Sequence, residues 1–443
     1  MAKKKDIVLK TSKTKLEMQD TVIFMTAYNV HKFKQRIPKF WKHGRIEDLL
    51  KQYHIYGISC KDIYASYDRK CSYSVEFDSL TQAPVFRFEE DVNRISEEFP
   101  DFSENMMKTL FLKYSAYVLF DSSQIKIPMC FNMENFLVVI DDRVLQVNPV
   151  AFMLNGSLIV NFKLIDFENA VQLSHDDIYG RSNNYGIKPI SKIKYLNESD
   201  FRDDNRKISD IVFKNIYDFI NKIEKGKLEV DNTSFVHNTL VISNKINNVD
   251  EYFQNVLGAP LDNLELTNIA ATNEFEYYSI ESLGVVTPTS YDDINHILFD
   301  CIMLESFKSY LLLKMIIDYE VNHKLDRIID SQIYVESLFY PSQVPIITLN
   351  VIDNLKGTFT FSRYKQAVDF KVRALKIEQE RKRISNGRLM NALLYILALI
   401  GSAQTLQVLQ TEFQLSFKNS FVVVMTAFVI FGAVWICREF KKR

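Results

Sequence analysis

The chain has 443 residues, and its 54 Lys and Arg residues nearly balance its 55 Asp and Glu residues, giving a net charge of −1. This balance excludes a protein that is attracted to nucleic acid by its overall positive charge, although it still allows local basic patches. Hydrophobic residues make up 47% of the sequence, whereas only 12 residues are glycine. The chain can therefore build large cores, and it contains neither of the phosphate-binding motifs GxxxxGK[ST] and GxGxxG.

Motifs that carry chemistry are absent from the sequence. The five cysteines form no CxxC pair, which argues against a disulfide framework or a zinc site and fits a reducing compartment. The seven histidines form no HExxH or HxH motif, and no GxSxG occurs. We therefore expect no metal, no cofactor, no catalytic residue and no enzymatic activity.

Residues 1–285 are predicted to form a cytoplasmic, ligand-sensing domain of mixed α and β structure. The clearest local signal is Asn155-Gly156 between two apolar runs, which is typical of a type I′ hairpin. The predicted strands are Val22–Ala27, Tyr73–Phe77, Val85–Glu89, Phe136–Ile140, Ile190–Tyr195 and Leu240–Ser243, and the predicted helices are Ser103–Tyr117 and Phe201–Ile223.

One segment of this domain, residues 175–186, combines turn-forming residues with side chains that can hydrogen-bond to or stack on a polar ligand. An ordinary surface loop is the alternative interpretation. The predicted ligand-binding residues are Arg181, Asn183, Asn184 and Tyr185.

Residues 286–388 are predicted to be helical and to end in a long stalk helix. Ser290 is the expected cap of a helix over residues 294–329, in which charged residues argue against a membrane span. A second helix runs from about Phe361 to Arg388, and its apolar stripe includes Tyr364, Val368 and Leu375. A single rod cannot bury such a stripe, so we expect it to self-associate or to pack on a neighbouring helix.

Two uncharged stretches, Leu389–Leu409 and Phe421–Cys437, lie near the end of the sequence. A membrane-spanning helix needs about 20 apolar residues, with about 17 as the short limit. We therefore predict a two-helix transmembrane hairpin and a basic tail over residues 389–443. The alternative is a helical hairpin buried in a large soluble core.

The connection between the two stretches is short, so both outer ends should lie on one side of the membrane. These ends are basic, and the positive-inside rule places them, with the N-terminal body, on the cytoplasmic side of the inner membrane. Basic residues at this level also suit anionic lipid headgroups. The predicted interface residues are Arg381, Lys382, Arg383, Arg388, Arg438, Lys441, Lys442 and Arg443.

Polar side chains define one face of the first predicted span. Asn391, Ser402 and Thr405 lie within about 60° of one another at 100° per residue. Polar groups are costly in hydrocarbon, so we predict that these three residues line a pore. Helix packing by small polar residues is the alternative.

The order of these segments resembles the CorA family of metal-ion channels: an α+β cytoplasmic body, a long α-helical stalk, a C-terminal two-helix transmembrane hairpin and a basic tail. In that family five copies surround a pore, and Gly-Met-Asn ends the first span as the ion selector. This chain instead carries Gln407-Val-Leu-Gln-Thr-Glu-Phe413 at the matching place. The resemblance implies a homo-oligomer, a pentamer, embedded in membrane lipid.

A divergent branch of CorA-like proteins is associated with type III CRISPR defence and responds to a nucleotide second messenger, an S-adenosylmethionine–AMP conjugate. This chain is similar to members of that branch, because it lacks both the selector motif and enzyme motifs. The resemblance implies a small nucleotide ligand and no direct contact with nucleic acid. Three hypotheses stay open: a ligand-gated membrane channel or effector, a divalent-cation transporter with altered selectivity, and a membrane-tethered, non-channel enzyme or scaffold.

Overall fold

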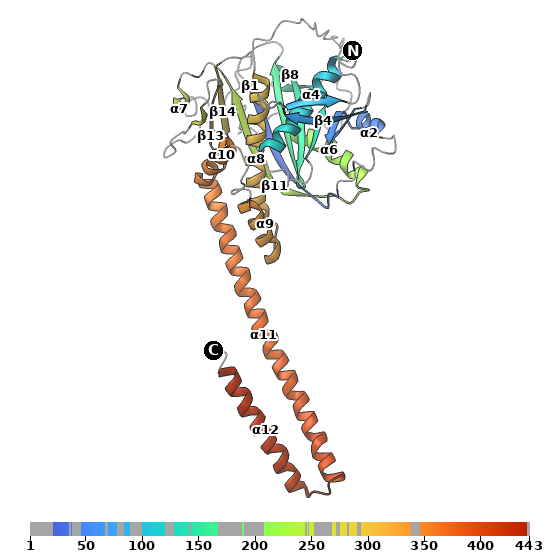
Figure 1. Ribbon diagram of the computed structural model, residues 1–443, viewed down its shortest axis with the longest axis vertical. Helices are drawn as coiled ribbons and strands as arrows, with labels where there is room; N and C mark the ends of the chain where they lie inside the picture. Colours follow the sequence, from blue (N-terminus) through green and yellow to red (C-terminus); the bar gives the residue numbers. More distant parts are fainter. Residues whose placement is uncertain are drawn as a thin grey trace. The chain divides into compact units, whose positions relative to one another are not determined.

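The computed structural model describes residues 21–34, 37, 46–66, 70–77, 84–88, 100–119, 128–140, 143–166, 188–189, 208–243, 246, 248–251, 268–271, 275–280, 283–289, 294–337 and 346–440. Packing divides the chain into two units, Met1–Asp369 and Phe370–Arg443. The first unit contains a mixed sheet with helices on both faces, and the second consists of helix (Figure 1).

The described strands form one sheet in the order β12-β13-β14-β11-β1-β9-β8-β6-β2-β3-β4-β5, with β7 and β10 attached beside β8. All neighbouring strands are antiparallel except β11 and β14. The strands are β1 (Thr21–His31), β2 (Ile55–Cys60), β3 (Ile63–Ser66), β4 (Lys70–Phe77), β5 (Pro84–Phe88), β6 (Met129–Met133), β7 (Phe136–Ile140), β8 (Arg143–Leu154), β9 (Ser157–Asp166), β10 (Lys188–Pro189), β11 (Glu229–Ile242), β12 (Asn268–Ala271), β13 (Phe275–Ile280) and β14 (Leu283–Pro288).

The predicted hairpin at Asn155-Gly156 is confirmed. Both residues have positive φ, 45° and 84°, as a type I′ turn requires, and the turn joins β8 to β9. Five of the six predicted strands overlap observed strands; residues 190–195, the sixth, lie outside the described residues.

Helices cover both faces of the sheet. On one face, α8 and α4 lie side by side, and Phe111 stacks on Phe299 between them at 5.6 Å. On the other face, α6 packs an apolar stripe against the strands, with Phe219 edge-on to Phe131. The described helices are α2 (Ile46–Gln52), α4 (Pro100–Leu119), α6 (Ile208–Ile223), α7 (Val249–Glu251), α8 (Ile294–Glu320), α9 (Leu325–Ser337), α10 (Ile346–Gly357), α11 (Phe359–Thr411) and α12 (Phe417–Phe440).

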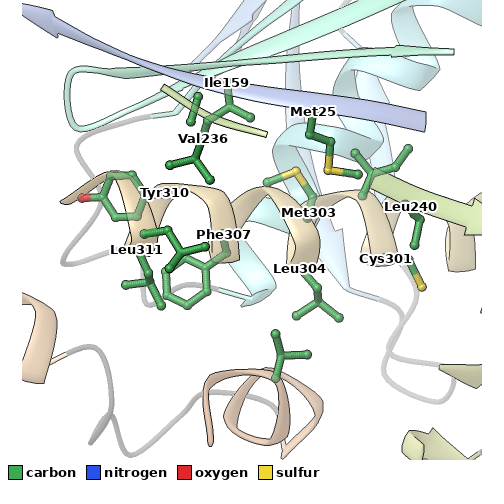
Figure 2. Packing of buried hydrophobic residues seen from close by; sticks show 14 of the residues in the cluster. Met25, Ile159, Val236, Leu240, Cys301, Met303, Leu304, Phe307, Tyr310 and Leu311 are labelled. Carbon is green, nitrogen blue, oxygen red and sulfur yellow. The ribbon is translucent and has the colours of Figure 1, made fainter. Parts of the chain in front are cut away.

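Helix α8 is the central helix of the larger core. Figure 2 shows its side chains, among them Met303, Phe307 and Leu311, packed between the sheet and a further helix. The predicted single helix over residues 294–329 is wrong in one respect: α8 ends at Glu320 and α9 begins at Leu325. The backbone N–H groups of Val321 and Asn322 both bond to the Ile317 carbonyl, and these bonds close the last turn of α8.

Polar residues of α8 are buried with partners in the sheet domain. Glu305 and Lys308, which are 0% and 1% exposed, form an ion pair of 2.5 Å. Ser279 donates a hydrogen bond of 2.8 Å to Glu305, and the Tyr277 hydroxyl also donates to it. Lys308 donates to the Ile280 carbonyl at 2.6 Å. These polar side chains therefore belong to a protein interior and not to a membrane span.

The start of α11 is anchored to the first unit. The Thr358 hydroxyl accepts a bond from the Phe361 backbone N–H, as an N-cap does. Phe361 and Val368 are buried, and Tyr364 packs edge-on against Tyr319 of α8 at 6.3 Å. The beginning of the predicted stripe thus packs on the chain's own helices, which is one of the two alternatives that the sequence left open.

Candidate functional site: an exposed apolar helix

Helix α11 continues to Thr411 as one unbroken helix, and α12 follows after five residues. Among the described residues, α11 is the helix that is long and apolar enough to cross a membrane, and none of its apolar window is buried. Leu389, Leu397 and Ile400 are 62%, 63% and 53% exposed. Globular proteins rarely expose a continuous apolar surface of this length unless it contacts lipid or another protein.

The predicted interface residues sit on the last charged turns before the apolar stretch. Arg381, Lys382, Arg383 and Arg388 are all exposed on α11, and Lys382 pairs with Glu378 at 2.6 Å across one turn. Arg438 lies near the end of α12, in a part of the helix that is described by its backbone alone, and Lys441, Lys442 and Arg443 lie outside the described residues.

The three predicted pore residues lie along α11, with Asn391 and Thr405 exposed and Ser402 half-buried. The Thr405 hydroxyl donates a 2.8 Å bond to the Gly401 carbonyl. This bond pairs the hydroxyl within its own helix. Placing Thr405 in the hydrocarbon of a membrane is therefore less unfavourable than placing an unpaired polar group there. The assignment of these three residues to a pore therefore stays a prediction, and it has less support for Thr405 than for Asn391.

A second apolar stripe, which the sequence analysis missed, lies at the start of the second unit. Phe370, Ile377 and Ile384 are exposed on α11, Phe370 at 74%. They are spaced by seven residues, so they lie within about 40° of one another on the helix. Seven-residue spacing of apolar side chains is typical of a helix that packs against another helix. The seven-residue spacing is visible in the sequence, but the predicted stripe was the one that contains Tyr364, Val368 and Leu375.

The predicted ligand residues Arg181, Asn183, Asn184 and Tyr185 lie outside the described residues. Among the residues that the structure describes, no group of three or more His, Cys, Asp or Glu side chains could hold a metal ion.

Lys113 of α4 is a deeply buried basic group beside the cysteines of this domain. It is 3% exposed, its ammonium group donates to the Tyr73 hydroxyl, and burial lowers its pKa to about 8. Burial raises the pKa of the Cys130 thiol to about 12. A thiol of this kind is a poor nucleophile, because the thiolate is the reactive form. The arrangement therefore fits a packed core better than a reaction site.

The comparisons with known proteins give no identity. No family model, no curated protein and no solved structure matches this chain.

Proposed function

We propose that the protein is an oligomeric, CorA-like membrane effector that is gated by a ligand of its cytoplasmic sheet domain. The observation that carries this proposal is the exposed apolar stretch of α11. The first turns of the same helix pack into the core of the sheet domain. Burying a Leu or Ile side chain is worth about 1.5–3 kcal/mol. Lipid therefore supplies the environment that this surface lacks in water.

In this proposal the membrane region has a pair of spans. Residues 421–437 of α12 carry no charge, and the five residues between α11 and α12 are too few to cross a bilayer. The two helices then form a hairpin with its tip on the non-cytoplasmic side of the membrane. The basic residues at both outer ends support a cytoplasmic position of the sheet domain in the inner membrane.

The stripe of Phe370, Ile377 and Ile384 supports self-association along the stalk. Leaving three large apolar side chains in water is unfavourable, and a second copy of the same helix offers the same seven-residue spacing. The resemblance to CorA architecture extends this to a pentamer around a central pore. Asn391, Ser402 and Thr405 then face the pore.

The ligand in this proposal is a nucleotide second messenger of the S-adenosylmethionine–AMP type, acting in antiviral defence, with Arg181, Asn183, Asn184 and Tyr185 in the sensor. The chain lacks Gly-Met-Asn at the end of its first span, which supports an effector over a magnesium transporter.

The test is fractionation and vesicle leakage with the full chain. We expect the protein to remain in the membrane pellet after alkaline extraction, and a chain that lacks Leu389–Arg443 to move to the soluble fraction. Reconstituted in dye-loaded vesicles, the full chain should release dye when the conjugate is added. Full extraction at alkaline pH would refute the membrane anchor, whereas a membrane-bound protein that never releases dye would refute the gated channel.

A further inference from the structure

A polar cluster lies at one end of the α8-facing side of the sheet. Along β1, this face carries Met25 and Ala27, which are in the core with α8, and then Asn29 and His31. Figure 2 shows the apolar region of this face, with Met25, Ile159 and Val236 over α8. The change from apolar to polar side chains marks where the core ends.

Asn29, His31 and Asp231 form a compact hydrogen-bonded group. The His31 Nε2 lies 2.5 Å from Asp231 Oδ2, and the Asn29 amide donates to the same oxygen at 2.7 Å. The Asn29 amide nitrogen also lies 2.9 Å from the same His31 Nε2, so the three side chains converge on one ring nitrogen and one carboxylate oxygen.

A break in strand pairing brings Asp231 to this position. The register of β1 with β11 shifts between Tyr28, which pairs with Phe235, and Val30, which pairs with Val230. Such irregularities redirect side chains and are frequent beside functional sites. Asp231 follows Val230 at this break, and its carboxylate reaches both β1 side chains.

Two acceptor atoms of this group have no partner within the described residues: Asp231 Oδ1 and Asn29 Oδ1. The group is partly open to solvent, because His31 is 37% and Asp231 19% exposed at the side chain. A ligand can therefore reach these acceptors.

Ser157 gives an independent sign of a ligand site. It is the cross-strand partner of Asn29 on β9, so the two side chains lie next to each other on the same face. Ser157 is 0% exposed, and its hydroxyl has no hydrogen-bond partner among the residues that the structure describes. A buried hydroxyl without a partner is unfavourable, and a ligand oxygen at this place would satisfy it.

The charge of the surroundings selects the ligand class. Asp231 contributes a carboxylate, and Lys32, the basic side chain at this end of the strand pair, is already paired with Glu229, so apart from the His31 ring the cluster carries about one negative charge. It therefore disfavours a phosphate and favours a group with several O–H donors. Carboxylates bind the neighbouring hydroxyls of a ribose in this manner.

We propose that Asp231, Asn29 and His31 bind the vicinal hydroxyl pair of a ribose-type sugar, with Ser157 as a fourth contact. This inference rests on the proposed function, because it assigns the ribose of the nucleotide ligand to this site. In this proposal, residues outside the site bind the phosphate of the nucleotide.

The experiment compares AMP with 2′,3′-dideoxy-AMP by calorimetry on the full chain in detergent. Wild-type protein should bind AMP at least tenfold more tightly than the dideoxy form, and Asp231→Asn should reduce this ratio to about one. Glu134→Gln is the matched control, because Glu134 pairs with His54 at 3.1 Å in a similar His–carboxylate contact elsewhere. The control should keep the full ratio.

A second variant guards against loss of folding. Ser157→Ala removes a hydroxyl that has no partner among the described residues, so the melting temperature should not fall while the affinity for AMP does. Three results would overturn the site: equal affinity of the wild-type protein for the two nucleotides, no binding of AMP, or an unchanged ratio of the two affinities in Asp231→Asn. If the conjugate still releases dye in any of these cases, the proposed function stands without this site. If the site discriminates but no dye is released, the channel proposal alone fails.

Discussion

Gly284 and Glu305 allow a quantitative test of how α8 is fixed to the sheet. Gly284 of β14 faces the buried carboxylate so closely that an added Cβ would lie 2.4 Å from Glu305 Oε1 and 2.7 Å from its Cδ. Lys308 and Ser279 hold the carboxylate in place, so it cannot swing away without losing them. The φ of Gly284 is not positive, so the conflict is steric and involves no backbone strain.

The expected cost of Gly284→Ala follows from these contacts. Overpacking a well-packed core costs about 1–3 kcal/mol, and breaking a buried ion pair costs about 3–5 kcal/mol. Because the carboxylate is displaced only partially, we expect a loss of about 3 kcal/mol. The first unit spans residues 1–369, which at about 2.1 cal/mol/K per residue gives an unfolding entropy of about 0.8 kcal/mol/K. The melting temperature should therefore fall by about 4 °C.

The assay is thermal unfolding of the full chain in detergent, followed by circular dichroism. Gly357→Ala is the matched control: outside its chain neighbours and its own helix backbone, no described atom lies within 4 Å of its added Cβ, and its φ is not positive. It should not lower the melting temperature. Glu305→Ala should destabilise on its own by leaving Lys308 buried without its partner carboxylate. On that background Gly284→Ala should cost less than about 1 kcal/mol. An equal cost of Gly284→Ala in both backgrounds would refute the steric argument.

Three further predictions use the same unfolding assay or the size of the particle. Asn155→Val should lower stability by about 2 kcal/mol or more, because a β-branched residue is strained at a φ of 45°. Tyr334→Phe leaves the turn residues unchanged and removes the hydroxyl that contacts Asn155 at 2.5 Å and also Tyr310, so it should cost about 1 kcal/mol. Equal losses would contradict the turn argument. Burial lowers the pKa of Lys113 and of Lys314 to about 8, below the unfolded value of about 10.5, so the unfolded state binds more protons and stability should rise as the pH increases from about 7.5 to about 9. Lys113→Met combined with Lys314→Met should remove most of this rise, because burial also lowers the pKa of Lys163, and a slope of unchanged size in the double variant would assign it to other groups. Replacing Phe370, Ile377 and Ile384 together by Ser should reduce the mass of the particle in detergent without lowering the melting temperature, whereas an unchanged mass would show that this stripe is not the contact between copies.

The sequence by itself predicted what depends on local patterns. The turn at Asn155-Gly156 requires two residues that tolerate positive φ, and that preference is written in the residue types. The apolar stretch of α11 was visible because a run of uncharged residues needs no knowledge of its neighbours. The same holds for the long helix, in which no proline interrupts the pattern.

The tertiary structure decided the features that depend on partners far apart in the chain. Glu305 and Lys308 are charged residues in an apolar helix, and only the sheet shows that they are buried with Tyr277, Ser279 and Gly284 around them. The end of α8 at Glu320 is likewise seen only in the structure, where Val321 and Asn322 bond back to the Ile317 carbonyl.

The polar cluster is the clearest case of this kind. Asn29 and His31 are separated from Asp231 by about 200 residues, and no motif connects them. The contact depends on the pairing of β1 with β11 and on the shift in their register, which moves Asp231 onto the side of the sheet where Asn29 and His31 lie. Strand register is set by the packing of the whole sheet, so single-residue preferences do not contain it.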